Sequence, residues 1–144
     1  MRYMLFILSL FTSLAFAEQK QVFGEYEVHY IGLTSSELDA DVAHLYGIER
    51  SRSLGFLNIS VLKKSADGGM PVPVDAKISG RIMNLIGQSR DLKFTRIQET
   101  GALYFYSTFR FDDQDMYNII LQVTPEGQQR TFDVKFSQRF YQGL

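Results

Sequence analysis

Apolar and polar side chains alternate with a period of two residues along most of this chain, and short glycine-rich turns interrupt the alternation. Since successive side chains of a β-strand point to opposite faces of its sheet, this pattern predicts strands with one buried face. Seven segments carry it: Val22–Ile31, Leu54–Lys63, Val74–Asn84, Leu92–Gln98, Ala102–Phe111, Met116–Thr124 and Arg130–Phe140.

Turn motifs join several of these segments directly, at Ser65–Gly69, Glu99–Gly101 and Pro125–Gly127. Strands linked so closely run antiparallel, because a parallel return needs a long crossover. Seven antiparallel strands with one apolar face each bury those faces best as two packed sheets. We therefore expect an all-β fold, an immunoglobulin-like antiparallel β-sandwich. A small closed barrel fits the same strand count and alternation.

One short amphipathic helix is predicted between the first two strands. Thr34-Ser-Ser-Glu37 has the spacing of a capping box, and Gly47 stands where a C-terminal cap belongs. The helix is expected to begin within Ser36–Asp41. Apolar residues recur there at helical spacing, at Leu38, Val42 and Leu45.

Residues 1–17 have the layout of a secretory signal peptide. Arg2 precedes an uncharged, mostly apolar run, and Ala15-Phe-Ala17 offers small residues at the two positions that signal peptidase reads. The run is shorter than the roughly 20 apolar residues of a membrane-spanning helix. We expect cleavage after Ala17, with residues 18–144 forming one domain in a Gram-negative periplasm, without stable membrane insertion.

Charge and cysteine content exclude several functional classes. Without Arg2, the chain carries 14 Lys and Arg against 16 Asp and Glu. A net charge of −2 gives no electrostatic basis for binding nucleic acid. The chain has no cysteine, which excludes disulfides, thiol catalysis and thiolate metal sites.

His29 and His44 are the two histidines of the chain. Glu27 shares the predicted strand face of His29, and a histidine with nearby carboxylates is the start of a zinc or copper site. We expect both histidines to be surface residues, with a metal site as the alternative, and predict no complete set of metal ligands and no cofactor. Asp112-Asp-Gln-Asp115 is expected to be a solvated turn, with calcium binding as the lesser alternative.

Tyr104, Tyr106 and Arg110 share a predicted strand face and form a candidate binding patch, since Tyr and Arg are favoured interface residues. We favour a structural explanation of the two tyrosines, either a strand buried on both faces or cross-strand tyrosine ladders on a solvated sheet. Arg50 and Arg52 are further candidates for binding an acidic partner or ligand. We favour a structural role, in which they tie the helix to the sheet by pairing with Asp39 or Asp41. No catalytic residue is predicted, because no serine lies in a nucleophile-elbow motif.

Three stretches of the chain resemble a family of small secreted proteobacterial proteins known as domain of unknown function 4426. They are Phe23–Tyr30, Val42–Ser51 and Leu57–Leu62. The resemblance is densest over residues 23–63 and covers most of the domain. It implies an exported β-sandwich and supplies no activity.

A rigid sandwich whose sequence has no recognisable catalytic motif favours a non-enzymatic, protein-binding or accessory module that engages another envelope protein. A periplasmic carrier of a small ligand or metal is the first alternative, motivated by His29 with Glu27 and by the 14% aromatic content. An unrecognised hydrolase is the second alternative. The oligomeric state is left open.

Overall fold

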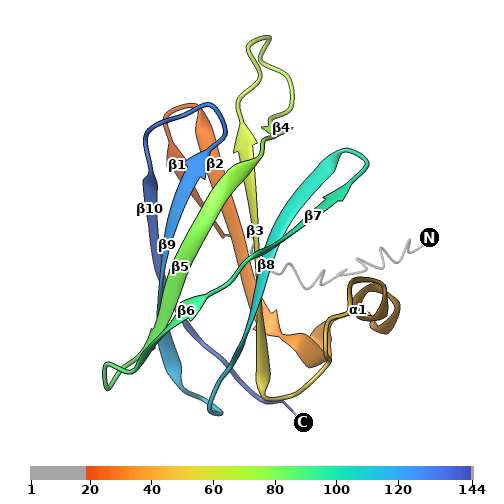
Figure 1. Cartoon of the computed structure of the whole chain (residues 1–144), viewed down its shortest axis with the longest axis vertical. Coiled ribbons are helices and arrows are strands. Elements are labelled where there is room, and N and C mark those ends of the chain that lie inside the picture. The colour runs from red at the N-terminus through yellow and green to blue at the C-terminus, as the bar shows by residue number, and fades with distance from the viewer. Residues whose placement is uncertain (1–18, 144) are drawn as a thin grey trace, which may run out of the picture.

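The computed structural model describes residues 19–143, which form two antiparallel β-sheets packed face to face (Figure 1). The larger sheet has the strand order β1-β2-β3-β8-β7, with the short β4 paired to β3, and the smaller has the order β10-β9-β5-β6. The larger sheet contains β1 (Gln19–Phe23), β2 (Tyr26–Thr34), β3 (Leu54–Lys63), β4 (Val72–Pro73), β7 (Thr95–Glu99) and β8 (Ala102–Arg110). The smaller contains β5 (Ala76–Asn84), β6 (Ser89–Leu92), β9 (Met116–Pro125) and β10 (Phe132–Arg139). The predicted all-β sandwich with one short helix is confirmed at this level.

Alternating side chains from both sheets fill the space between them. The inward residues of the predicted faces are buried as expected: Val28, Leu57, Ile59, Ile119, Leu121 and Val134 are among those fully shielded from solvent. Aromatic stacking closes one long side of the sandwich. Phe23 of β1 stacks on Phe132 of β10 at 4.7 Å between ring centroids, and Tyr30 stacks on Phe136 at 4.1 Å.

The strand count of seven is wrong, because two predicted segments each hold two strands. Gly24, with φ of +61°, turns the chain between β1 and β2 inside the segment predicted as Val22–Ile31. The segment Leu92–Gln98 passes from one sheet to the other: β6 pairs with β5, whereas β7 pairs with β8. The β6–β7 segment thus crosses the open side of the sandwich as a strap (Figure 1). With β4, these splits give ten strands in the described residues.

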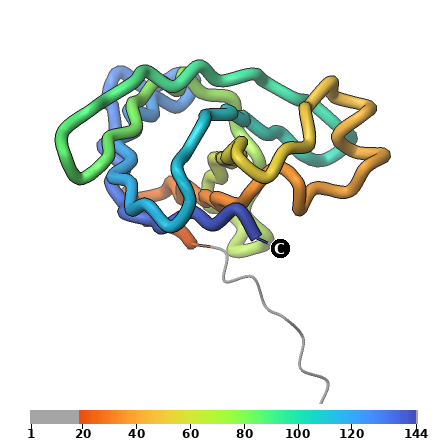
Figure 2. The backbone as a smooth tube through the Cα atoms, turned by 90° about the horizontal axis from the view of Figure 1, so that it is seen from below, coloured from red at the N-terminus to blue at the C-terminus, as the bar shows by residue number. Residues whose placement is uncertain are grey.

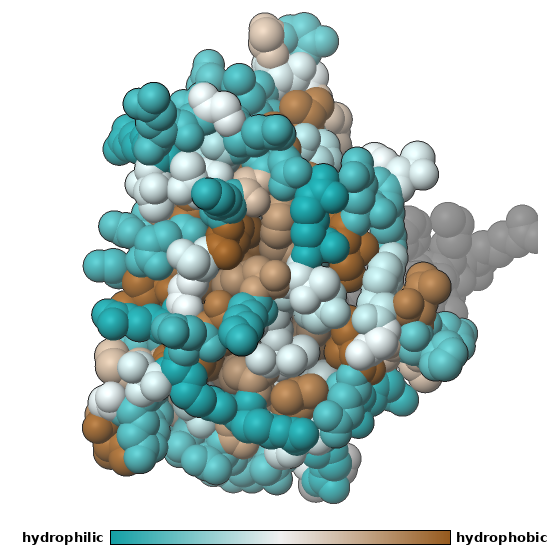
Figure 3. All heavy atoms as spheres, viewed as in Figure 1, coloured by the Kyte–Doolittle hydropathy of each residue, from teal (hydrophilic) through white to brown (hydrophobic). Residues whose placement is uncertain are grey.

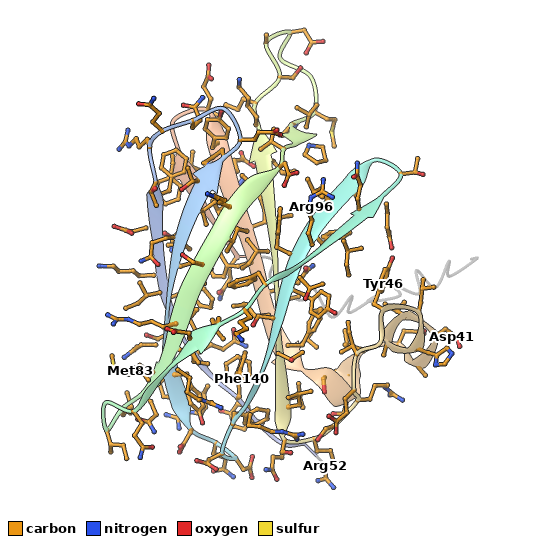
Figure 4. The ribbon with its side chains drawn as sticks, in the orientation of Figure 1. Asp41, Tyr46, Arg52, Met83, Arg96 and Phe140 are labelled. Carbon is orange, nitrogen blue, oxygen red and sulfur yellow. The ribbon has the colours of Figure 1, made fainter. Side chains whose placement is uncertain are left out.

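The predicted helix is present as α1 (Ala40–Tyr46), preceded by a 3₁₀ turn over Ser35–Glu37. Glu37 accepts a 2.8 Å hydrogen bond from the Thr34 N–H, so the capping motif serves the 3₁₀ turn. Asp39 caps α1 by accepting from the N–H groups of Asp41 and Val42, and Gly47 ends it at φ of +67°. Tyr46 and Asp41 mark the two ends of this helix in Figure 4.

The expected apolar face of the helix is wrong at Val42 and Leu45, whereas Leu38 packs against the sheet-side cluster as expected. Val42 is 45% exposed and Leu45 72% exposed, while Ala43 is buried. Ala43 packs in a small second core with Ile48 and Phe56, on the outer face of the larger sheet. The seven-residue helix α1 has few side chains that can contact the sheet. The small side chain of Ala43 lets the helix backbone lie close to Phe56.

Among residues 19–143 there is no helix of the length and apolarity that a membrane span requires. The predicted signal peptide and its cleavage site lie outside the described residues.

Candidate functional site

Glu27 and His29 lie side by side on the outer face of the larger sheet. β2 directs Tyr26, Val28 and Tyr30 into the core, so the intervening residues face outward. His29 has Lys20 of β1 opposite it on one side and Ser60 of β3 on the other. The pairing of β1 with β2 therefore determines which charges meet at this point of the sheet.

A hydrogen bond of 2.9 Å joins Glu27 Oε2 to His29 Nε2, and both side chains are largely buried although they lie on an outer face. The Lys20 ammonium lies 3.7 Å from the other carboxylate oxygen, Oε1. The hydrogen bond from His29 is the main cause that lowers the pKa of Glu27, partial burial opposes it, and the charge of Lys20 adds to it. Glu27 is thus held as a carboxylate, the form that binds cations.

His44 does not join this pair as a metal-binding group. It is an exposed residue in the last turn of α1. Within residues 19–143, no three His, Asp or Glu side chains lie close enough together to hold a metal ion. Glu27 and His29 come together as one carboxylate and one imidazole.

Tyr104 and Tyr106 are half-buried on the same outer face but have different neighbours. Tyr106 stacks on Phe56 at 5.6 Å and packs against the second core. Tyr104 lies opposite Ile97 of the edge strand β7. Arg110, at the far end of β8, donates instead to Ser53 Oγ at 3.1 Å and to Glu49 at 3.4 Å. These three residues share a strand but do not form one compact patch.

Arg50 and Arg52 bind backbone carbonyls. Arg50 donates to the carbonyl of Ser36 at 2.9 Å, which ties the chain after α1 to the 3₁₀ turn. Arg52, near the lower end of the molecule in Figure 4, donates to the carbonyls of Gln142 and Gly143. Both contacts are structural, but the partners are not the expected Asp39 and Asp41.

The acidic loop Asp112–Asp115 also helps to hold the C-terminal segment. Asp113 Oδ1 accepts from the Gln142 N–H at 2.8 Å, and the Asp112 N–H donates to the Tyr117 hydroxyl at 2.9 Å. Phe140 points into the space between the sheets (Figure 4) and is almost completely buried. The loop therefore has a structural part in fastening β10 and the residues after it.

Sequence reasoning missed Lys20 as a partner of Glu27, because it placed no strand before Val22. It also missed the apolar tip of the β5–β6 loop. Leu85 is 70% and Ile86 80% exposed there, next to Gly87 at φ of +85°. Glycine after an alternating segment signals a turn, but nothing in that pattern shows that the two preceding side chains remain uncovered.

Taken together, the chain is a two-sheet antiparallel sandwich with a carboxylate–imidazole pair on its outer face and a helix inserted between β2 and β3. The family model described as Domain of unknown function (DUF4426) matches residues 20–143, and the chain belongs to this family. The resemblance noted in the sequence is thereby confirmed. No curated protein sequence matches the chain.

Solved structures show the same fold. A DUF4426 family protein from Pseudomonas aeruginosa is 29% identical, with a TM-score of 0.74 over 86% of this chain and 94% of the other. A copper-bound variant of FetP from uropathogenic Escherichia coli is 14% identical, with a TM-score of 0.61 over 89% and 97%. A copper-bound variant of P19 from Campylobacter jejuni is 10% identical, with a TM-score of 0.54 over 85% and 94%. At these identities the likeness to FetP and P19 concerns the fold.

Proposed function

We propose that this protein is a periplasmic metal carrier whose metal contact is the Glu27–His29 pair, with Cu²⁺ as the first candidate ion. The observation that carries the proposal is the 2.9 Å contact between these two side chains on an outer sheet face. The fold adds support, because relatives of the same architecture have been solved with copper bound.

The chemical groups of Glu27 and His29 are of the types that bind such an ion. Imidazole nitrogen suits Cu²⁺ and Zn²⁺, and a carboxylate that stays ionised adds charge. The number of ligands is too small for a closed site. A closed protein site has about four ligands, and the described residues bring two together here. The remaining positions would be filled by water or by groups of another molecule. Such a site exchanges its ion readily, as a carrier that hands the ion on requires.

Calorimetric titration of the purified mature protein with Cu²⁺ tests this, with electron paramagnetic resonance to detect nitrogen bound to the ion. His29→Ala should abolish both the heat of binding and the nitrogen signal. His44→Ala is the matched control, because it removes the exposed histidine of α1, and it should leave both unchanged. Equal losses in the two variants, or no binding by the wild type, would contradict the proposal.

Lys20 gives a second readout of the same site. Its ammonium lies close to the Glu27 carboxylate and opposes a second cation there. Lys20→Gln should strengthen Cu²⁺ binding by roughly tenfold or more, because one unit charge at about 4 Å opposes a divalent ion by about 2 kcal/mol even in water. A weaker affinity in this variant would place the ion elsewhere.

The second candidate function is a non-enzymatic accessory module that binds another envelope protein. The exposed pair Leu85 and Ile86 favours it, because Figure 2 shows the β5–β6 loop (green) projecting beyond the rest of the backbone. Hydrogen bonds between Asn84 and Gln88 close the base of this loop at 2.8 to 3.0 Å, so the tip is held rigidly. Scattered apolar residues are common on surfaces, but two adjacent ones on a rigid tip indicate a contact.

A photoreactive amino acid introduced at position 86 in living cells tests this second function. We expect one discrete adduct with an envelope protein, lost when Leu85 is changed to Ser. A photoreactive residue at the exposed position 122, on the outer face of β9, is the control and should give no such adduct. Identical adducts from both positions would mean non-specific contact.

The periplasmic location and the immunoglobulin-like topology belong to the same proposal. Mass spectrometry of the protein recovered from a periplasmic fraction should give the mass of residues 18–144. Recovery of the uncleaved chain from that fraction would refute processing after Ala17.

A further inference from the structure

Strand β7 leaves one edge of the larger sheet open. It ends the strand order of that sheet and pairs with β8 on one side (Figure 1). Glu99 and Ala102 close a two-residue turn, so alternate residues of β7, counted back from Glu99, exchange backbone hydrogen bonds with β8. The N–H and C=O groups of Arg96 and Gln98 therefore point away from β8, and no backbone group of the described residues pairs with them.

The other terminal strands of the two sheets have features that discourage the addition of a strand. β1 carries Lys20. On β10, the carbonyl of Lys135 already accepts a 3.0 Å hydrogen bond from the Gln21 side chain. β6 is four residues long and carries two charged side chains. β7 has no lysine, proline or bulge, and the charge of Arg96 is paired with Asp75 at 3.0 Å.

The sequence of β7 is complementary to a second copy of itself. When two β7 strands pair antiparallel about Ile97, each Ile97 lies opposite its counterpart, a favourable pair of β-branched side chains. Thr95 lies opposite Glu99 of the second copy. Arg96 lies opposite Gln98, so the residues with open backbone groups face each other and exchange four hydrogen bonds. No pair in this register places like charges opposite each other.

The side chains on this edge offer little apolar area. Ile97 is half-buried, and the other four residues of β7 are exposed. Figure 3, seen from the same side as Figure 1, shows hydrophilic and hydrophobic residues mixed on the right of the molecule, without a continuous apolar patch. A second copy would therefore be held mainly by backbone hydrogen bonds, with one small apolar contact at Ile97.

We propose that the chain forms a weak antiparallel dimer through β7, in which two larger sheets become one continuous sheet. In strand addition of this kind, backbone hydrogen bonds give affinity and alternate side chains give specificity. The contact is isologous, so both open edges are covered at once. Four backbone hydrogen bonds and one isoleucine pair correspond to a dissociation constant of about 0.1–1 mM. The contact includes neither Glu27 nor His29 and does not depend on metal binding.

Disulfide trapping tests this register, because the chain has no cysteine of its own. Residues that lie opposite each other without sharing hydrogen bonds have Cα atoms about 4.5 Å apart, within the range of a disulfide. Ile97→Cys should form a linked dimer in metal-free glutathione buffer at least about tenfold faster than Gln122→Cys, because pairing holds the two thiols together. Gln122 is exposed on the outer face of β9, so its thiol is the more accessible of the two.

A mixture of the Thr95→Cys and Glu99→Cys proteins tests the same register at two exposed positions. The mixture should give the mixed dimer, because each of these residues lies opposite the other. Thr95→Cys alone should cross-link slowly, since its two copies lie roughly 14 Å apart, four residues along the strands. Equal rates for the mixture and the single variants, or an Ile97→Cys rate no higher than that of Gln122→Cys, would overturn the proposal.

Two substitutions of Gln98 test the backbone contact without a cysteine. Gln98→Pro removes the outward N–H and leaves the pairing with β8 intact, since proline is tolerated where the N–H of an edge strand faces solvent. Gln98→Ala is the matched control that keeps the N–H. Between about 0.05 and 1 mM protein, the amide signals of β7 should shift with concentration in the wild type and in Gln98→Ala, but not in Gln98→Pro. Wild-type signals independent of concentration, or equal shifts in both variants, would contradict the dimer.

Discussion

Alanine in place of Gly55 tests how tightly the two central strands of the larger sheet are packed. Gly55 of β3 lies opposite Phe109 of β8, and the Phe109 ring covers the glycine. A Cβ atom at position 55 would lie 2.4 Å from the Cε2 and Cζ atoms of that ring. Carbon atoms in contact are about 3.5–4.0 Å apart, so the ring would have to move by more than about 1 Å.

The ring has little room to move. Phe109 is buried, meets Phe140 edge-to-face at 5.1 Å and lies 6.4 Å from Tyr117. Overpacking of this kind costs about 1–3 kcal/mol. Alanine in a strand interior otherwise gains about 0.5–1 kcal/mol over glycine. We expect Gly55→Ala to lower the free energy of unfolding by about 1–2 kcal/mol and the melting temperature by about 3–10 °C.

Urea and thermal unfolding followed by circular dichroism measure this loss, and a double-mutant cycle assigns it. In the background of Phe109→Leu the ring is gone, so Gly55→Ala should cost much less or become stabilising. Gly32→Ala is a control in the neighbouring strand, because the atoms near its Cβ belong to the flexible amide end of Gln138. A Gly55→Ala variant as stable as the wild type, or an equal cost in both backgrounds, would refute the packing argument.

Three further predictions concern the ion pair between the sheets, the core and the C-terminal segment. Arg96 holds the pKa of Asp75 below its ordinary value of 3.8 through a hydrogen bond, so this carboxylate stabilises the fold above about pH 4 and loses that effect as the pH falls through the lowered value. Asp75→Asn should therefore flatten the acid side of the stability profile measured by urea unfolding, and an unchanged profile would contradict this. Ser107 has a buried hydroxyl without a hydrogen-bond partner in the described residues, so Ser107→Ala should leave stability unchanged or raise it by up to about 1 kcal/mol in the same assay. Arg52→Ala should speed carboxypeptidase digestion of the C-terminal residues, whereas Arg50→Ala, which frees Ser36 instead, should not.

The sequence predicts the layers of this fold better than its strand boundaries. Alternation identified the inward residues of β9, such as Tyr117 and Ile119, because a regular strand keeps its phase throughout. A tight turn inside an alternating run changes the phase without ending the run. Phe23 packs inward and Val22 is 53% exposed, although the continuous strand would have buried Val22 with Tyr26. The turn at Gly24 is the cause.

The candidate site was predictable only where it depends on one strand. Glu27 and His29 are two residues apart on β2, so a single strand suffices to bring them together. Lys20 reaches them only through the pairing of β1 with β2, which no pattern within a single strand shows.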